Sequence, residues 1–302
     1  MKIIDAHAHL WLNVDTVVNG QSIHPLEPNR SRSLFFGEER QMLPPWMTDG
    51  QNTAERLLSN MDYAQVSAAV ITQEFIDGPQ NSYLLQVQKR YPDRFFCFGM
   101  PNSRVVGFKE EAERLLNLGF RGIKVPAARL PQRFLSDEMM QMMLLLEQRR
   151  AILGIELMDS DAQVGQMEEI IQQCPHLKVA IGHFGMVTRP GWMSQIRLAR
   201  HANVYIESGG ITWLFNDEFY PFPSAVRAIR EAADAVGWGK LMWGSDYPRT
   251  ITAITYRMSY DFVTKSPELT DDEKQLFLCD NAKQFFGFGE LVELPYIKNM
   301  SE

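Results

Sequence analysis

The 302-residue sequence predicts an α/β protein folded as a (β/α)8 TIM barrel. Short apolar or β-branched runs recur at a spacing of roughly 25–35 residues, and amphipathic stretches separate most of them. Such alternation is typical of parallel strands joined by crossover helices. An open doubly wound sheet is the alternative. No GxGxxG follows the first run, so the dinucleotide-binding form of that sheet would lack its phosphate loop.

The predicted strands are eight short runs, namely 2–6, 67–72, 95–99, 121–125, 151–157, 177–182, 203–207 and 240–244. In the stretch 110–120, apolar residues recur every three or four positions, which is the helical period. Residues suited to helix ends occur where the pattern requires them. Ser136 is a candidate N-cap, Thr270 with Glu273 forms a capping-box pattern, and Gly119 is a candidate C-cap.

Residues 10–51 interrupt this rhythm as a long connection between the first strand and its helix. A connection of this length in a compact domain is usually functional or disordered. On a barrel it would lie over the C-terminal face, where active sites form. We interpret it as a substrate-covering loop, with a surface excursion or an oligomer contact as the alternative. Since we find no internal repeat and no low-complexity tract, we expect residues 1–302 to form a single barrel domain.

Composition narrows the classes of function. Hydrophobic residues make up 45% and charged residues 22%, values that are ordinary for a soluble globular protein. The net charge of −7 argues against nucleic acid and against an anionic membrane surface as partners. The N-terminus lacks the pattern of a signal peptide, and no apolar run reaches the ~18 residues of a membrane span. Three dispersed cysteines without a CxxC pair suggest reduced thiols in a cytoplasmic protein.

Candidate metal ligands follow three of the predicted strands. Alternate side chains of a strand point the same way, so His7 and His9 project together and could bind one metal ion. His183 follows the sixth strand, and Asp246 follows the eighth, where a carboxylate can ligate a metal or act as a general base. The alternatives are histidines that form only structural hydrogen bonds and an aspartate that belongs to a turn.

These residues lie in motifs that resemble the amidohydrolase superfamily. The motifs are DAHAHLW, GFRGIKV, IGHFG, YIESGG and LMWGSDYP at strands, with DNAKQFFGF near the end of the chain. The resemblance covers nearly the whole chain and is to the amidohydrolase-related branch, which includes carboxymuconate-semialdehyde decarboxylase-like enzymes and sugar lactonases. It implies a distorted (β/α)8 barrel of the metal-dependent hydrolase type or, less often, a carbon–carbon or carbon–oxygen lyase.

The resemblance also implies roles for the strand-end residues. His7 and His9 match the first-strand metal ligands, and Asp246 matches an aspartate that binds the metal or activates water. His183 matches a histidine that binds the metal or polarises the substrate. Glu156 stands where the family often has a histidine ligand on the fifth strand. A carboxylate there can still bind a metal and would favour harder metals, so we expect Glu156 to complete a His-His-Glu-Asp site with His7, His9 and Asp246. The alternative is that no metal is held tightly. We expect one divalent ion, zinc, with manganese as the alternative.

Further polar and aromatic residues are candidates for substrate binding. Lys124 could hold an anionic group or be a carbamylated ligand, and Glu207 could orient the sixth-strand histidine or bind substrate. Arg32 and His24 in the long connection could meet a substrate carboxylate, and Trp11 could wall the pocket. The alternative for each is a structural or solvent-facing role.

The sequence thus supports three hypotheses of function. The first is metal-dependent hydrolysis of a small molecule, a lactone or a carboxylated ring, in which Asp246 moves a proton and His183 stabilises an oxyanion. The second is a non-oxidative decarboxylase or hydratase with the same residues. The third is a non-catalytic metal-binding barrel. All three leave open whether the protein forms a homo-oligomer.

Overall fold

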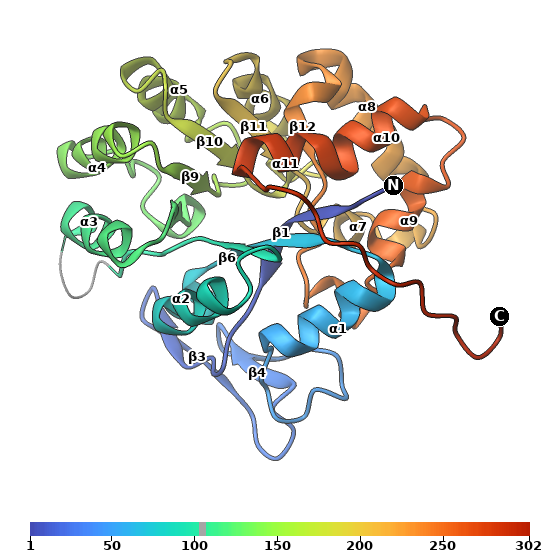
Figure 1. The fold of residues 1–302 in the computed structure, drawn as a ribbon. Helices are drawn as coiled ribbons and strands as arrows, with labels where there is room; N and C mark the ends of the chain where they lie inside the picture. The colour runs from blue at the N-terminus through green and yellow to red at the C-terminus, as the bar shows by residue number, and fades with distance from the viewer. Residues whose placement is uncertain (103–106) are drawn as a thin grey trace.

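The computed structural model describes residues 1–102 and 107–302, and a barrel of parallel strands lies at its centre (Figure 1). Within the described residues its strands are β1 (Ile4–His9), β6 (Ala68–Thr72), β7 (Phe95–Cys97), β8 (Gly122–Val125), β9 (Ile152–Ile155), β10 (Lys178–Ile181), β11 (Val204–Glu207) and β12 (Leu241–Met242). Each of them overlaps one predicted run. The predicted (β/α)8 fold class is confirmed.

Two junctions close the barrel. Strands β1, β6 and β7 form one parallel ladder, and β8 to β12 form another. At one junction Gly99, just after β7, forms a parallel bridge to Ile123 of β8. At the other junction the backbone N–H of Ala6 donates to the carbonyl oxygen of Trp243 at 2.8 Å. Because both ladders are joined at both edges, the open doubly wound sheet is excluded.

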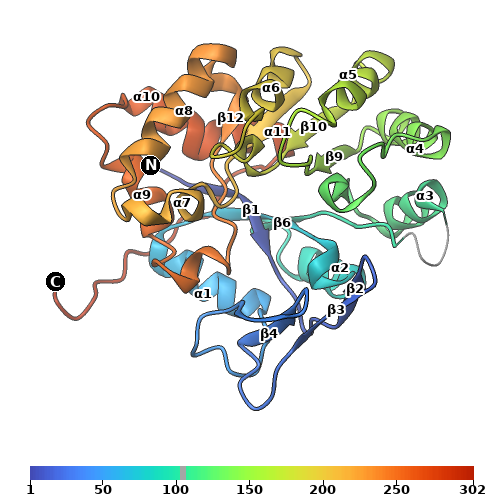
Figure 2. The same cartoon turned by 180° about the vertical axis from the view of Figure 1, so that it is seen from behind.

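The helices surround the barrel, as the two opposite views show (Figures 1 and 2). They are α1 (Ala54–Ala64), α2 (Asn81–Arg90), α3 (Phe108–Leu118), α4 (Asp137–Gln148), α5 (Val164–Gln173), α6 (Trp192–Arg197), α7 (Ile211–Leu214), α8 (Pro223–Val236), α9 (Met258–Thr264), α10 (Asp271–Gln275) and α11 (Asn281–Phe286). No helix within residues 1–102 and 107–302 has the length and apolar character needed to cross a bilayer.

The predicted helix ends are confirmed. The Ser136 side chain accepts a hydrogen bond from the Met139 backbone N–H at 3.2 Å, which caps α4. Thr270 and Glu273 form the reciprocal bonds of a capping box before α10. Gly119 ends α3 in the left-handed conformation, with φ 113°.

Helix α11 closes the end of the barrel opposite the strand C-termini. Phe285 and Phe286 pack with side chains inside the barrel, including Phe96 and Phe98. Lys178, at the start of β10, donates to the carbonyl oxygen of Phe285 at 2.8 Å. With this end filled, the only strand ends left to face a ligand are the carboxyl ends, where barrel active sites form.

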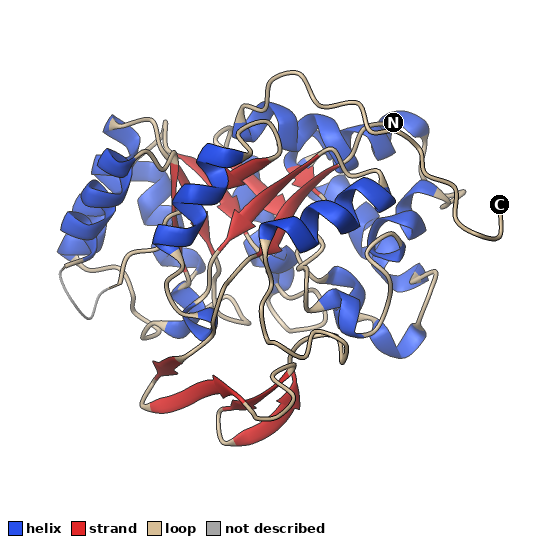
Figure 3. Ribbon diagram, turned by 60° about the horizontal axis from the view of Figure 1, so that its bottom comes forward, coloured by secondary structure: helices blue, strands red, loops and turns tan. Residues whose placement is uncertain are grey.

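The long connection 10–51, which the sequence predicted as a loop, contains regular structure. It forms an antiparallel sheet of β2 (Thr16–Val18), β3 (Gln21–Pro25), β4 (Arg32–Phe35) and β5 (Glu38–Gln41), set apart from the barrel strands in Figure 3. Asn19 and Gly20, with φ 50° and 79°, join β2 to β3. An Asn-Gly pair with two positive φ angles is the preferred two-residue hairpin turn, so the sequence did carry this signal.

A matched pair of leucines on α3 tests the predicted amphipathic helix. Leu115 is fully buried in the core between helix and barrel, whereas Leu118 is 44% exposed. Leu115→Ala should lower the free energy of unfolding by about 2–5 kcal/mol, because it leaves a cavity. Leu118→Ala should change it by about 0.5 kcal/mol or less. Urea unfolding curves measure both values, and equal losses would contradict the assigned faces of α3.

Candidate metal centre

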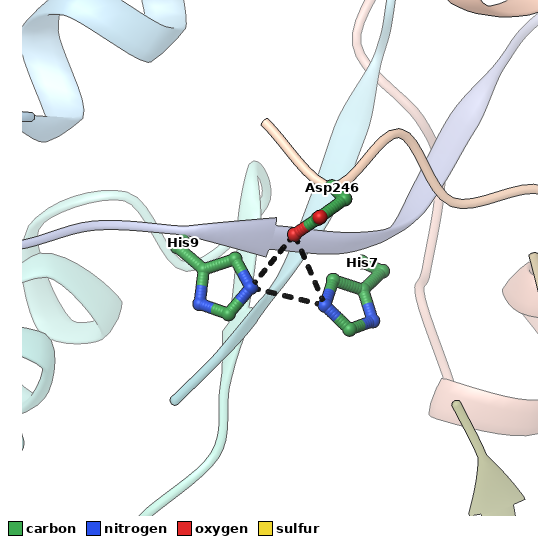
Figure 4. Close-up of side chains that lie close together, drawn as sticks. All are labelled: His7, His9 and Asp246. Atoms are coloured by element: carbon green, nitrogen blue, oxygen red, sulfur yellow. Dashed lines mark hydrogen bonds and ion pairs between the residues drawn. The ribbon is translucent and has the colours of Figure 1, made fainter. Parts of the chain in front are cut away.

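Three buried donor groups meet at the carboxyl ends of β1 and β12. His7 and His9 lie on β1 and Asp246 lies in the turn after β12, each no more than 2% exposed. The two Nε2 atoms are 3.0 Å apart. Asp246 Oδ1 lies 3.1 Å from Nε2 of His9 and 3.6 Å from Nε2 of His7 (Figure 4). Ligand atoms around a tetrahedral zinc ion lie about 3.4 Å apart, so these separations suit one metal ion.

The other nitrogen of each imidazole faces a carboxylate. His7 Nδ1 lies 2.6 Å from Glu207 Oε1, and His9 Nδ1 lies 3.1 Å from Asp77 Oδ2. These carboxylates favour a proton on Nδ1 and leave the lone pair on Nε2, the arrangement that orients metal-binding histidines. Among the described residues, Asp246 Oδ1 has no hydrogen-bond partner. Two lone pairs and a carboxylate oxygen thus converge, and this donor set fits a divalent cation.

Glu156 and His183 form a second group that also includes His7. His183 begins the short 3-10 turn His183–Gly185 after β10, and its Nε2 lies 3.4 Å from Glu156 Oε1. Lys124 Nζ lies 2.5 Å from the same Glu156 oxygen. Because Lys124 balances the buried carboxylate, burial alone does not require a metal at Glu156.

The pKa values of three groups at this end of the barrel follow from their neighbours. Burial raises the pKa of Glu156, but Lys124 and His183 outweigh burial and hold it well below its ordinary value. Burial lowers the pKa of His183, and Glu156 overcomes this effect and raises it to about 10. Burial also raises the pKa of Asp246, but His9 and Arg249 bring it below its ordinary value. At neutral pH Asp246 is therefore ionised and His183 is protonated.

Carboxylates outnumber cationic side chains around this cluster. Among the described residues, the buried carboxylates that pair with a histidine, lysine or arginine at this end of the barrel are Glu74, Asp77, Glu156, Glu207 and Asp246. Their cationic partners are Lys124, Arg129 and Arg249. With His7 and His9 neutral and His183 protonated, five carboxylates and four cationic groups leave one negative charge. This surplus of negative charge favours the binding of a cation.

Backbone strain occurs at two of the candidate residues. His183 has φ 58° and Asp246 has φ 59°, backbone angles that residues other than glycine rarely adopt. Hydrogen bonds hold both conformations. The N–H of Asp246 donates to the carbonyl oxygen of His7 at 2.9 Å, and His183 Nδ1 lies 2.9 Å from the carbonyl oxygen of Gly209. Strained conformations that the surroundings enforce in this way cluster at functional sites.

A cavity of about 650 Å³ opens onto this cluster, a size suited to a small molecule. Its lining includes His9, Glu156, His183 and Asp246. Phe35 of β4 and residues 40–42, at and just after the end of β5, also line the cavity. The connection 10–51 therefore borders the cavity, which is the position expected of a substrate-covering segment.

The structure does not bring the other candidates from this connection to the cavity. Arg32 pairs with Glu39 at 2.6 Å on the exposed surface of the small sheet. His24 lies opposite Leu34 in the β3–β4 pairing. The indole N–H of Trp11 donates to the carbonyl oxygen of Gly50 at 3.0 Å. The register of the sheet accounts for Arg32 and His24, whereas Trp11 lies outside the sheet in a bridge to Asn52. None of the three lines the cavity, so none is supported as a substrate contact.

Lys124 and Glu207 are also not among the residues that line the cavity. Each is less than 5% exposed and contacts a candidate ligand, Lys124 beside Glu156 and Glu207 beside His7. Their contacts support a role in holding the donor groups rather than the expected contact with substrate.

Sequence reasoning missed several charged residues at this end of the barrel. Asp77 contacts His9 and Arg249, and Arg129 pairs with Glu74 at 3.0 Å on the cavity wall. Glu74 and Asp77 follow the second barrel strand within a few residues. Carboxylates directly after a buried strand were the available signal. Arg249, three residues after Asp246, carried no comparable signal.

Solved structures share the fold at low sequence identity. A probable 2-pyrone-4,6-dicarboxylic acid hydrolase from Acinetobacter baumannii, with citric acid bound, is 19% identical over 95% of this chain and 100% of its own, with TM-score 0.67. An amidohydrolase from Burkholderia multivorans with bound zinc is 17% identical over 95% and 99%, with TM-score 0.69. A 5-carboxyvanillate decarboxylase from Novosphingobium aromaticivorans with bound manganese is 17% identical over 78% and 81%, with TM-score 0.54.

The family of this chain follows from its sequence. No curated protein matches the sequence significantly. A model of the family described as "Amidohydrolase" matches residues 4–288, which include every strand of the barrel and all the candidate ligands. This chain therefore belongs to the amidohydrolase family.

Proposed function

We propose that this protein is a metal-dependent hydrolase that opens a small carboxylated lactone. One observation carries the proposal: the donor atoms of His7, His9 and Asp246 converge beside a protonated His183 at the wall of a 650 Å³ cavity. The site thus combines places for a Lewis acid, a proton acceptor and a cationic hydrogen-bond donor around one small volume.

His7, His9 and Asp246 would hold the metal, with His183 and Glu156 next to it. Two imidazoles and a carboxylate suit zinc, and manganese is the alternative because it accepts more oxygen ligands. The zinc and manganese ions bound in the similar structures support a divalent ion here. When bound, such an ion polarises a carbonyl group and lowers the pKa of a water molecule towards about 7.

The residues of the chain supply the proton transfers. Asp246, ionised at neutral pH, accepts a proton from the water that attacks the lactone carbonyl. Protonated His183 donates a hydrogen bond to the oxyanion that develops there. A carbon–oxygen bond forms to the water, the ring carbon–oxygen bond breaks, and Asp246 returns its proton to the leaving oxygen. The product is a hydroxy acid.

Arginines and apolar side chains on the cavity wall support a carboxylated substrate. Arg40, Arg129 and Arg249 line the cavity together with Phe35 and Trp213. A guanidinium group recognises a carboxylate through paired hydrogen bonds, and the rings offer flat surfaces to a planar substrate. The similar structure titled as a probable pyrone dicarboxylate hydrolase, with citric acid bound, supports the same class.

Non-oxidative decarboxylation is the second candidate. A protonated His183 facing the cavity could also deliver a proton to the carbon that loses carbon dioxide. The manganese-bound 5-carboxyvanillate decarboxylase among the similar structures supports this reading. Release of carbon dioxide from aromatic acids would favour it, and release of acid from lactones would favour the hydrolase.

We further propose that the protein works in the cytoplasm and does not bind nucleic acid. Cys97, Cys174 and Cys279 are all buried free thiols, a state that persists where the environment is reducing. The net charge of −7 opposes association with nucleic acid.

Metal content tests the first part of the proposal. Purified protein should contain about one divalent ion per chain, and His7→Ala should lose most of it, because the ion's binding depends on the full donor set. His201→Ala is the matched control, since His201 is half-exposed and pairs only with Glu168 among the described residues. Elemental analysis measures all three proteins. Equal metal in both variants would remove His7 from the site.

Substitution of the proposed base tests the second part. Asp246→Asn should reduce kcat by about 10²–10⁴-fold, because an amide cannot accept the proton of water. Turnover is measured as acid release from a panel of carboxylated lactones, and as carbon dioxide release from aromatic acids. Exposed Asp217→Asn is the control. Full activity of Asp246→Asn, with unchanged thermal unfolding in both variants, would overturn the assignment.

A further inference from the structure

The two carboxylate oxygens of Asp246 have different surroundings. Oδ1 faces the Nε2 atoms of His7 and His9 and has no hydrogen-bond partner among the described residues. Oδ2 accepts a hydrogen bond from the indole N–H of Trp213 at 3.0 Å. One oxygen is therefore tethered, and the other is left facing the imidazoles.

Trp213 contacts both proposed catalytic groups, Asp246 and His183. It belongs to α7, which follows β11, and it lines the cavity. Besides its bond to Asp246, its ring meets the His183 ring edge-on, with centroids 6.3 Å apart. One rigid side chain thus contacts both residues that would move charge in the reaction.

The glycine at the start of α7 makes room for this indole. Gly210 has φ 74°, and a Cβ atom there would overlap the Trp213 indole nitrogen. Any larger residue at position 210 would push the N–H away from Asp246 in addition to straining the backbone.

The chemistry of the indole suits this contact. An indole N–H is a donor with no acceptor and no charge. It can hold a carboxylate oxygen without offering a competing ligand to a metal and without changing the charge of the site. A lysine or arginine at this position would add charge, and a histidine would add a second ligand.

We propose that Trp213 is a positioning residue, whose indole N–H holds Asp246 Oδ2 so that Oδ1 is presented to the imidazoles, and that Gly210 keeps the indole in place. The consequences for metal binding and turnover rest on the proposed function. The contact itself does not. The competing view is that Trp213 only walls the cavity.

The contact is tested by NMR of the indole N–H groups in the full-length ¹⁵N-labelled protein. Trp213→Phe identifies the Trp213 resonance among the signals of the six tryptophans. Asp246→Ala should shift that resonance upfield and speed its exchange with solvent. The resonance of Trp11, whose N–H is bound to Gly50, should stay in place. An unmoved Trp213 resonance would overturn the inference whether or not a metal is bound.

The functional consequence is tested by metal competition with a chelator. Trp213→Phe and Gly210→Ala should each weaken metal affinity by about 10–100-fold, the usual effect of removing a partner of a ligand. Trp46→Phe is the matched control, because Trp46 is 62% exposed and does not line the cavity. Thermal unfolding establishes that each variant is folded. If Gly210→Ala fails to fold, Trp213→Phe alone decides.

A double-mutant cycle separates positioning from a wall effect. If Trp213 acts through Asp246, Trp213→Phe should cause no further loss of metal affinity in the Asp246→Asn background. Losses that add, or a raised KM with metal affinity intact, would make Trp213 a wall residue and overturn the inference. Wild-type protein without any metal affinity would instead refute the proposed function, and the NMR measurement would still decide the Trp213 contact.

Discussion

Backbone hydrogen bonds between β1 and the chain after β12 are the constraint on which the site depends. The N–H of Asp246 donates to the carbonyl oxygen of His7 at 2.9 Å, and the N–H of His9 donates to that of Tyr247 at 2.8 Å. These bonds join the first barrel strand to the segment after the last one, and they fix both segments that carry the donor groups. Asp5 strengthens the same junction, since it accepts the N–H of Ser245 at 2.8 Å. The spacing of the donors is therefore a property of barrel closure, which is more precise than placement by loops.

Charge is the second constraint, because burying carboxylates is costly unless cations lie beside them. Lys124 and Arg129 meet this need for Glu156 and Glu74, and Arg249 meets it for Asp77. The remaining negative charge attracts either protons or a metal. At His183 it favours a proton, because Glu156 raises the pKa of this histidine to about 10 against the effect of burial. A metal ion would bind the imidazole lone pairs of His7 and His9. Protons compete for the same lone pairs, so metal affinity should fall as pH falls.

The sequence predicted the barrel strands and the meeting of His7, His9 and Asp246, because both depend on local patterns. Apolar runs mark buried strands, and strand ends place His7, His9 and Asp246 on one face. Contacts across the fold were harder to predict. Asp77 and Arg249 are 172 positions apart, and no local pattern reveals that they meet. The position of Arg32 was hard to predict for another reason. It depends on the pairing of β4 with β5, where Arg32 contacts Glu39 and does not line the cavity, and Arg32 itself carries no signal of that pairing.

Two glycines of the sequence motifs lie at strand ends where neighbouring atoms leave no room for a side chain. A Cβ atom at Gly209 would lie 2.7 Å from the His7 ring, and one at Gly244 would lie 2.6 Å from the His7 Cβ. Atoms do not approach so closely, so any larger side chain at either position would displace His7 from Glu207, His9 and Asp246. Gly209 ends the YIESGG motif with Gly210, and Gly244 lies two residues before Asp246. These motifs therefore describe one packing arrangement: a buried imidazole–carboxylate pair that only strands lacking side chains at the contact can accommodate.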